Sequence, residues 1–109
     1  MATYFKNVLK SELGITETEI LAVASNARAT VIGLSLTNLT GGVVLISIRV
    51  EDDTMASAYY IKDVILPPNQ SLRVVNVGER LVLAPSTTMY INASVDNSLD
   101  LLMSYVEIV

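Results

Sequence analysis

The sequence predicts an all-β protein: a single antiparallel β-sandwich of about eight strands with an N-terminal arm. Apolar and polar residues alternate along several runs, and polar or proline-containing turns separate these runs at a spacing of roughly 8–15 residues. The chain has 109 residues, which is enough for one hydrophobic core between two packed layers. These patterns fit an immunoglobulin-like sandwich and a jelly roll equally well, so both topologies stay open.

The N-terminal segment, residues 1–14, fits the alternating pattern least well. Its apolar residues have helical spacing, but Gly14 follows soon after them, so a short helix and a strand-like arm are both possible. We therefore expect an arm over residues 1–14 and the sandwich domain over residues 15–109. The apolar residues of the arm are Tyr4, Phe5, Val8 and Leu9.

The clearest alternation lies in two consecutive runs, residues 30–38 and residues 43–51. In the first, Ile32, Leu34 and Leu36 are expected to share one face. The residues between the runs include two glycines, which reach positive φ without steric cost and favour a turn. We therefore predict that the two runs form a hairpin. The second run places Val44, Ile46, Ile48 and Val50 on one face, with Ser47, Arg49 and Glu51 opposite.

The remaining strands are shorter and are bounded by turn residues. A weaker strand is expected at residues 19–24. Further strands are expected at residues 59–66, which two prolines end, and at 70–77, 79–83 and 89–95, with turns at 76–78 and 96–98.

The last strand, residues 99–109, is apolar on both of its faces. Leu99, Leu101, Met103 and Tyr105 alternate with Leu102, Val106 and Ile108. A strand with two apolar faces needs cover on both sides, yet a domain of this size has one core. We therefore expect the face of Leu102, Val106 and Ile108 to meet another polypeptide. The apolar arm residues either fold back on their own sandwich or reach onto a neighbouring subunit.

Composition excludes most chemistry. The chain has no histidine and no cysteine, which removes the commonest general base, thiolate nucleophiles and thiolate metal sites. Its net charge is −4 and its seven lysines and arginines are scattered, so nucleic-acid binding is not expected. No apolar run approaches the roughly 20 residues of a membrane helix, and no secretory signal is recognisable. We expect no cofactor, no resident metal and no membrane partner.

Two clusters could still carry a function. The acids Glu51, Asp52 and Asp53 could act as a carboxylate pair or bind Ca²⁺ weakly, although a charged, edge-protecting turn explains them more simply. Tyr59 and Tyr60 suggest carbohydrate stacking. Adjacent strand residues face opposite ways, however, so the two rings cannot form one platform.

Three segments carry a resemblance to a known group of proteins. They are residues 27–38 (ARATVIGLSLTN), residues 59–72 with YYIKD followed by LPPNQSL, and residues 81–108, from LVLAP to the final VEI. Their order resembles small all-β virion proteins of tailed bacteriophages, including phages of marine and cyanobacterial hosts. The resemblance covers residues 20–109. The chain departs from the pattern at residues 24–26, where a Pro-Ala-Gly-like turn is expected.

The resemblance implies a structural protein of the virion, assembled in the host cytoplasm and without catalytic residues. It implies a symmetric homo-oligomer, a trimer or a ring, that binds major capsid, neck or tail proteins. Capsid cementing is the preferred role, a neck or tail adaptor is the alternative, and a carbohydrate-binding module is a candidate from a different class. The residues expected at the interface are Tyr4, Phe5, Val8, Leu9, Leu102, Val106 and Ile108.

Overall fold

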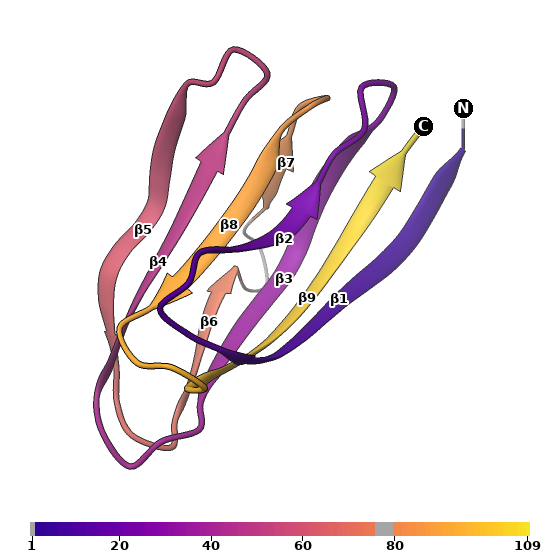
Figure 1. Ribbon diagram of the computed structural model, residues 1–109. Coiled ribbons are helices and arrows are strands. Elements are labelled where there is room, and N and C mark those ends of the chain that lie inside the picture. The colour runs from indigo at the N-terminus through magenta and orange to yellow at the C-terminus, as the bar shows by residue number, and fades with distance from the viewer. Residues whose placement is uncertain (1, 76–79) are drawn as a thin grey trace.

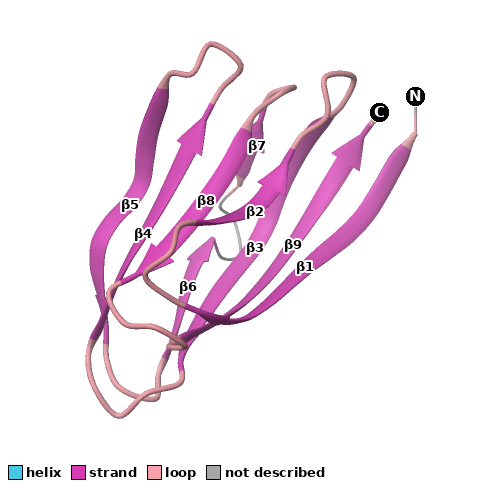
Figure 2. Cartoon of the chain, viewed as in Figure 1, coloured by secondary structure: helices cyan, strands magenta, loops and turns pink. Residues whose placement is uncertain are grey.

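The computed structural model describes residues 2–75 and 80–109, and these residues form two antiparallel sheets packed face to face (Figure 1). No helix occurs in the described part of the chain (Figure 2), and it contains no helix that could cross a membrane. The all-β sandwich predicted from the sequence is confirmed. The strands are β1 (Thr3–Leu13), β2 (Thr18–Ala22), β3 (Arg28–Asn38), β4 (Val44–Glu51), β5 (Ser57–Leu66), β6 (Ser71–Val75), β7 (Leu81–Leu83), β8 (Thr88–Ala93) and β9 (Leu99–Ile108).

The strand pairing is that of one long hairpin rolled into two layers. The first half of the chain pairs with the second half in reverse order: β1 with β9, β2 with β8, β3 with β6 and β7, and β4 with β5. Rolling adds the pairs β3 with β9 and β4 with β8. Sheet A therefore has the order β1-β9-β3-β6, with β7 also on β3, and sheet B has the order β2-β8-β4-β5. This is a jelly-roll topology rather than an immunoglobulin-like one.

The predicted hairpin of residues 30–38 and 43–51 is wrong. The two runs are strands β3 and β4, but β3 lies in sheet A and β4 in sheet B. Their connection crosses between the layers, and neither Gly41 nor Gly42 adopts the left-handed backbone conformation. Side chains hold the crossing instead, because buried Asn38 donates hydrogen bonds to the carbonyls of Gly42, Leu66 and Pro67.

The core lies between the inward faces of the two sheets. The predicted alternation of β9 is confirmed, since Leu99, Leu101, Met103 and Tyr105 are all buried. In β4, Val44, Ile46 and Ile48 are fully buried and face them across the sandwich. One side of each sheet is therefore buried in the protein's own core.

Strand β3 departs from the predicted alternation at Ile32. A β-bulge lies between Val31 and Gly33, so that Val31 and Leu34 are both buried while Ile32 turns outward and is 42% exposed. A bulge inserts one extra residue and reverses the facing of the residues beyond it. The expectation that Ile32 shares the core face with Leu34 and Leu36 is therefore wrong.

The N-terminal segment is a strand, not a helix. Strand β1 pairs with β9 of its own chain and forms an outer edge of sheet A (Figure 1). Beyond it, Ala2 and Val109 exchange two backbone hydrogen bonds of 2.9 Å, so the two termini lie side by side. The predicted turn at residues 76–78 lies outside the described residues, as do the adjoining ends of the strands predicted on either side of it.

Candidate self-association surface

The outward side of sheet A carries three successive rows of side chains across β1, β9 and β3. Their register follows from the strand pairing, in which Phe5 lies opposite Val106, Asn7 opposite Ser104, and Leu9 opposite Leu102. Rows on one side of a sheet lie roughly 7 Å apart along the strands. We call the outward side of sheet A face A; its central rows are Phe5/Val106/Thr30, Asn7/Ser104/Gly33 and Leu9/Leu102/Ser35, and β6 and β7 border it along β3.

Large apolar side chains stand in solvent on face A. Phe5 is 80% exposed, Leu9 is 70% exposed and Leu102 is 48% exposed. Ile32 joins them because the bulge turns it outward, and Val82 of β7, which pairs with Thr30, adds another exposed apolar side chain to the first row. Contiguous exposed apolar side chains on one surface are typical of an interaction site.

A shallow hollow lies between the two apolar rows. The middle row consists of Asn7, Ser104 and Gly33, which are small or polar, so the surface is depressed there. The hollow has a volume of about 580 Å³, and Phe5, Ile32 and Ser104 are among the residues that line it. The apolar rows therefore stand as two ridges with a groove between them.

Charges on face A are confined to its ends and one side. Among the described outward-facing residues of β1, β9 and β3, no charged residue lies between Arg28 at one end and Asp100 at the other. Arg73 lies at the β6 side, paired with Ser35. The Asp100 carboxylate accepts a hydrogen bond from the backbone N–H of Glu12 at 3.2 Å. The centre of the surface is therefore free of charge.

Face A unites five of the seven residues predicted at an interface: Phe5, Leu9, Leu102, Val106 and Ile108. Tyr4 and Val8 project from the opposite side of β1, because successive strand residues alternate. Val8 packs against the core. Two further members, Ile32 and Val82, were missed. The alternation of Leu81, Val82 and Leu83 was a usable signal for Val82, whereas no sequence pattern reveals the bulge that exposes Ile32.

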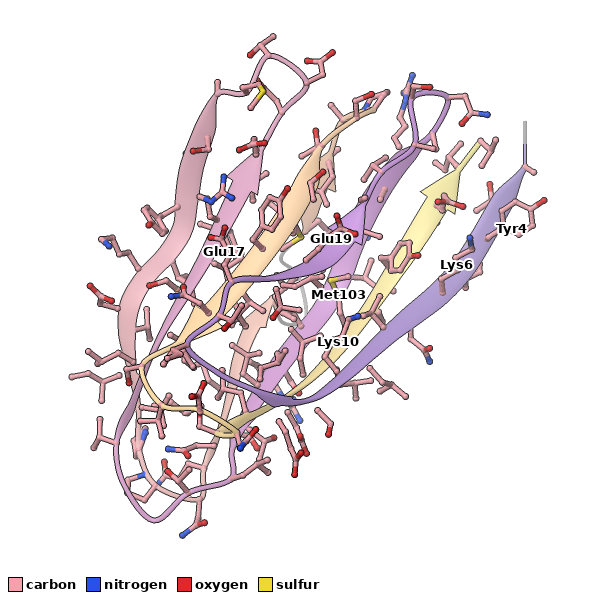
Figure 3. The ribbon with its side chains drawn as sticks, in the orientation of Figure 1. Tyr4, Lys6, Lys10, Glu17, Glu19 and Met103 are labelled. Atoms are coloured by element: carbon pink, nitrogen blue, oxygen red, sulfur yellow. The ribbon has the colours of Figure 1, made fainter. Side chains whose placement is uncertain are left out.

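On the inner side of β1, Tyr4 and Lys6 belong to a small charged cluster (Figure 3). The Lys6 ammonium lies 2.9 Å from a carboxylate oxygen of Glu107 and 5.7 Å from the centre of the Tyr4 ring. The hydrogen bond and charge of Glu107 raise the pKa of Lys6. These contacts attach β1 to the C-terminal end of β9.

The outward side of sheet B combines exposed apolar side chains, among them Tyr59 and Ile65, with paired charges around Arg49. The Arg49 guanidinium donates to both carboxylate oxygens of Glu17, at 2.8 and 3.1 Å, and to Glu51 at 2.7 Å. It also lies 4.4 Å from the centre of the Tyr90 ring. Its hydrogen bonds lower the pKa of Glu17 and raise the pKa of Arg49 itself. Unlike the centre of face A, this surface carries charged side chains.

In the acidic loop, which the sequence offered as a possible catalytic or calcium site, the carboxylate of Asp52 accepts hydrogen bonds from the loop itself. One carboxylate oxygen of Asp52 accepts hydrogen bonds from the N–H and hydroxyl of Thr54 and from the N–H of Ala56, at 2.7 to 3.1 Å. The bonds from Thr54 lower the pKa of Asp52. Glu51 is engaged with Arg49. Within residues 2–75 and 80–109 no three His, Cys, Asp or Glu side chains are placed to hold a metal ion.

The two tyrosines of β5 point to opposite sides, as expected. Tyr59 is half exposed, and the ammonium of Lys62 lies 4.5 Å from the centre of its ring. Tyr60 packs against the core. The pair therefore offers no double-ring platform for a sugar.

No protein-family model matches the chain, and no curated protein matches it either. Solved structures do share its fold. One, reported as Bacillus endospore appendages that form a novel family of disulfide-linked pili, aligns over 96% of this chain and 86% of the other, with a TM-score of 0.58 and 11% identity. Another, from the T13 IBDV viral particle, aligns over 96% of this chain but only 30% of the other, with a TM-score of 0.55 and 9% identity. The chain is similar in fold to subunits of a pilus and of a viral particle.

Proposed function

We propose that the protein is a non-enzymatic structural subunit that associates with copies of itself and belongs to the virion of a tailed phage. The observation that carries this proposal is face A, a surface with a charge-free centre on which Phe5, Leu9 and Leu102 stand in water. Burying such side chains contributes about 25 cal/mol per Å² of apolar surface. A partner that covers face A would recover this free energy.

The two structural neighbours support a role in assembly but not a particular particle. Both belong to large assemblies, one of them a pilus and the other a viral particle. The pili are described as disulfide-linked, whereas this chain has no cysteine. Copies of this protein therefore cannot be joined by disulfides, and we infer that they associate through surfaces such as face A.

The sequence resemblance implies a virion protein bound to the capsid, neck or tail. We place cementing of the capsid, in which the subunit covers contacts between major capsid proteins, ahead of a neck or tail adaptor, because a compact single domain with an apolar N-terminal segment suits clamping. The number of copies per particle distinguishes the two roles, because a cement repeats over the whole shell while an adaptor occurs in one ring.

Two measurements test the proposal. The mass of the purified protein in solution, determined by light scattering, is expected to be a discrete multiple of the 11.8 kDa chain. A monomer at every concentration would count against self-association. Quantitative mass spectrometry measures the copy number of the protein in purified particles of a phage whose genome carries the gene. For a cement, we expect a copy number that is a fixed ratio of that of the major capsid protein. A copy number matching one ring would favour the adaptor, and absence from the particles would refute the virion role.

A further inference from the structure

We infer that face A binds face A of a second copy of the same chain, in a two-fold arrangement with antiparallel strands. This inference rests on the proposed function and deepens it, because it names the surface and the orientation through which copies associate. Three observations support it: the chemical character of the face, the placement of its charges, and its shape and size.

Face A is chemically better suited to contact face A of a second copy than to contact the outward side of sheet B. The outward side of sheet B carries Arg49, Lys62 and Asp63, and covering these with apolar side chains would cost their hydration. The apolar ridges of face A impose no such cost on one another, and its charged residues Arg28, Asp100 and Arg73 lie at its ends and at the β6 side. A surface that mates with the same surface of a second copy forms an isologous contact with two-fold symmetry.

The charges at the two ends of face A decide the orientation. Arg28 pairs with Ile108 at one end, and Asp100 pairs with Thr37 at the other. If two copies packed with parallel strands, Arg28 would meet Arg28 and Asp100 would meet Asp100. With antiparallel strands, Asp100 of each copy lies toward Arg28 of the other, so the contact gains two opposite-charge pairs instead of two like-charge pairs.

The ridges fit the same orientation. The row of Asn7, Ser104 and Gly33 lies midway between the apolar rows, so a two-fold axis through it exchanges the Phe5/Val106 row with the Leu9/Leu102 row. Each apolar ridge then contacts the other apolar ridge of the second copy. The same axis places the hollow of one copy opposite the hollow of the other.

The face is large enough for a specific contact. Residues 100–108 of β9 span roughly 27 Å, and the strands β1, β9, β3 and β6 together are roughly 19 Å wide. This gives roughly 500 Å² of sheet per copy and roughly 1,000 Å² for the pair, and side-chain relief increases it, so the contact reaches the lower range of specific interfaces.

The first experiment compares two matched substitutions by light scattering on the full chain. Leu102→Glu places a charge in an apolar row of face A, and Ile65→Glu places the same charge at a similarly exposed apolar position on sheet B. We expect Leu102→Glu to weaken association roughly 100-fold and Ile65→Glu to leave it unchanged. Circular dichroism and melting temperature establish that both variants are folded. If Leu102→Glu does not fold, Phe5→Ser with Tyr59→Ser as its control replaces the pair.

The second experiment tests the orientation by exchanging charges. Asp100→Arg alone places two arginines opposite one another, and Arg28→Asp alone places two aspartates opposite one another, so each variant is expected to dissociate. With parallel strands each single variant would only exchange one like-charge pair for another, and it would associate as the wild type does. With antiparallel strands the double variant Arg28→Asp/Asp100→Arg restores both opposite-charge pairs, and its mass is expected to return to that of the wild-type oligomer. Single variants that associate like the wild type, or a double variant that remains dissociated, would overturn the antiparallel orientation.

The outcomes separate this inference from the proposed function. A wild-type oligomer that Leu102→Glu leaves intact would refute the role of face A while leaving self-association standing. An oligomer that both Leu102→Glu and Ile65→Glu disrupt would refute pairing of face A with itself and indicate contact between face A and sheet B. A wild-type monomer at all concentrations would refute self-association altogether.

Discussion

Replacing Asn38 by aspartate is expected to destabilise the fold strongly, although the two side chains have nearly the same shape. The Asn38 amide nitrogen donates to the carbonyls of Gly42 at 2.8 Å and of Leu66 and Pro67 at 3.1 Å. Its side-chain oxygen accepts from the N–H and hydroxyl of Thr40, at 2.9 and 2.8 Å. Aspartate can still accept the two hydrogen bonds from Thr40. Its second carboxylate oxygen, however, replaces the donating amide nitrogen and cannot donate to the three carbonyls.

The magnitude follows from burial. Asn38 is 1% exposed, and its bond to Leu66 lies in the buried part of the network. An unsatisfied buried polar group costs about 1–3 kcal/mol, and the carbonyls nearer the surface recover part of their loss from water. We therefore expect Asn38→Asp to lower the free energy of unfolding by about 3 kcal/mol at neutral pH. Asn26→Asp, at an exposed loop position, is the matched control and is expected to change stability by less than about 0.5 kcal/mol.

Urea denaturation followed by circular dichroism measures the difference, and its pH dependence gives an independent check. In the folded Asn38→Asp variant, burial beside carbonyl oxygens raises the pKa of the new carboxyl above its unfolded value. The folded state then binds the proton more tightly, so the penalty is largest at neutral pH and shrinks as the pH falls through the raised pKa. A variant as stable as the wild type, or a penalty that grows on acidification, would refute the role given to Asn38 in holding this connection.

Three further predictions concern the loops and the N-terminal strand. Gly14→Ala is expected to lower the free energy of unfolding by about 1–3 kcal/mol, because the added methyl carbon would lie 2.8 Å from the Cα of Asp96 on the facing loop. Thermal or urea unfolding measures the difference, and wild-type stability would contradict the close approach. Asp52→Ala is expected to be less stable than the wild type at neutral pH. The pKa of Asp52 is lowered by folding, so its contribution is present above the ordinary aspartate value of 3.8 and disappears as the pH falls through the lower folded value; urea midpoints that differ equally at neutral and strongly acidic pH would contradict this. Deleting residues 1–13 is expected to cause aggregation in light scattering, since it exposes the edge of β9, whose two faces are both apolar, and a soluble, folded product would show that β9 tolerates being an edge.

Alternation in the sequence was sufficient to locate most of the strands and to assign the residues of β9 to its two faces. The buried set Leu99, Leu101 and Met103, and the opposite set that includes Leu102 and Val106, were both predicted correctly. The separation of Tyr59 from Tyr60 was predicted on the same grounds. These features follow from the two-residue period of a strand, which is a local property of the backbone and needs no knowledge of neighbouring strands.

The choice of neighbouring strands, in contrast, is made in three dimensions. The run 30–38 pairs with β9, which is far away in sequence, rather than with the run that comes next, and the buried faces of β3 and β4 enter one core from opposite sheets. The bulge that exposes Ile32 depends on the register with β9. Face A arises from the same non-local pairing, since only the alignment of β1 and β3 on either side of β9 brings Phe5, Leu102 and Ile32 onto one surface. Alternation gives each strand its two faces, but hydrogen bonding between distant strands determines what those faces build.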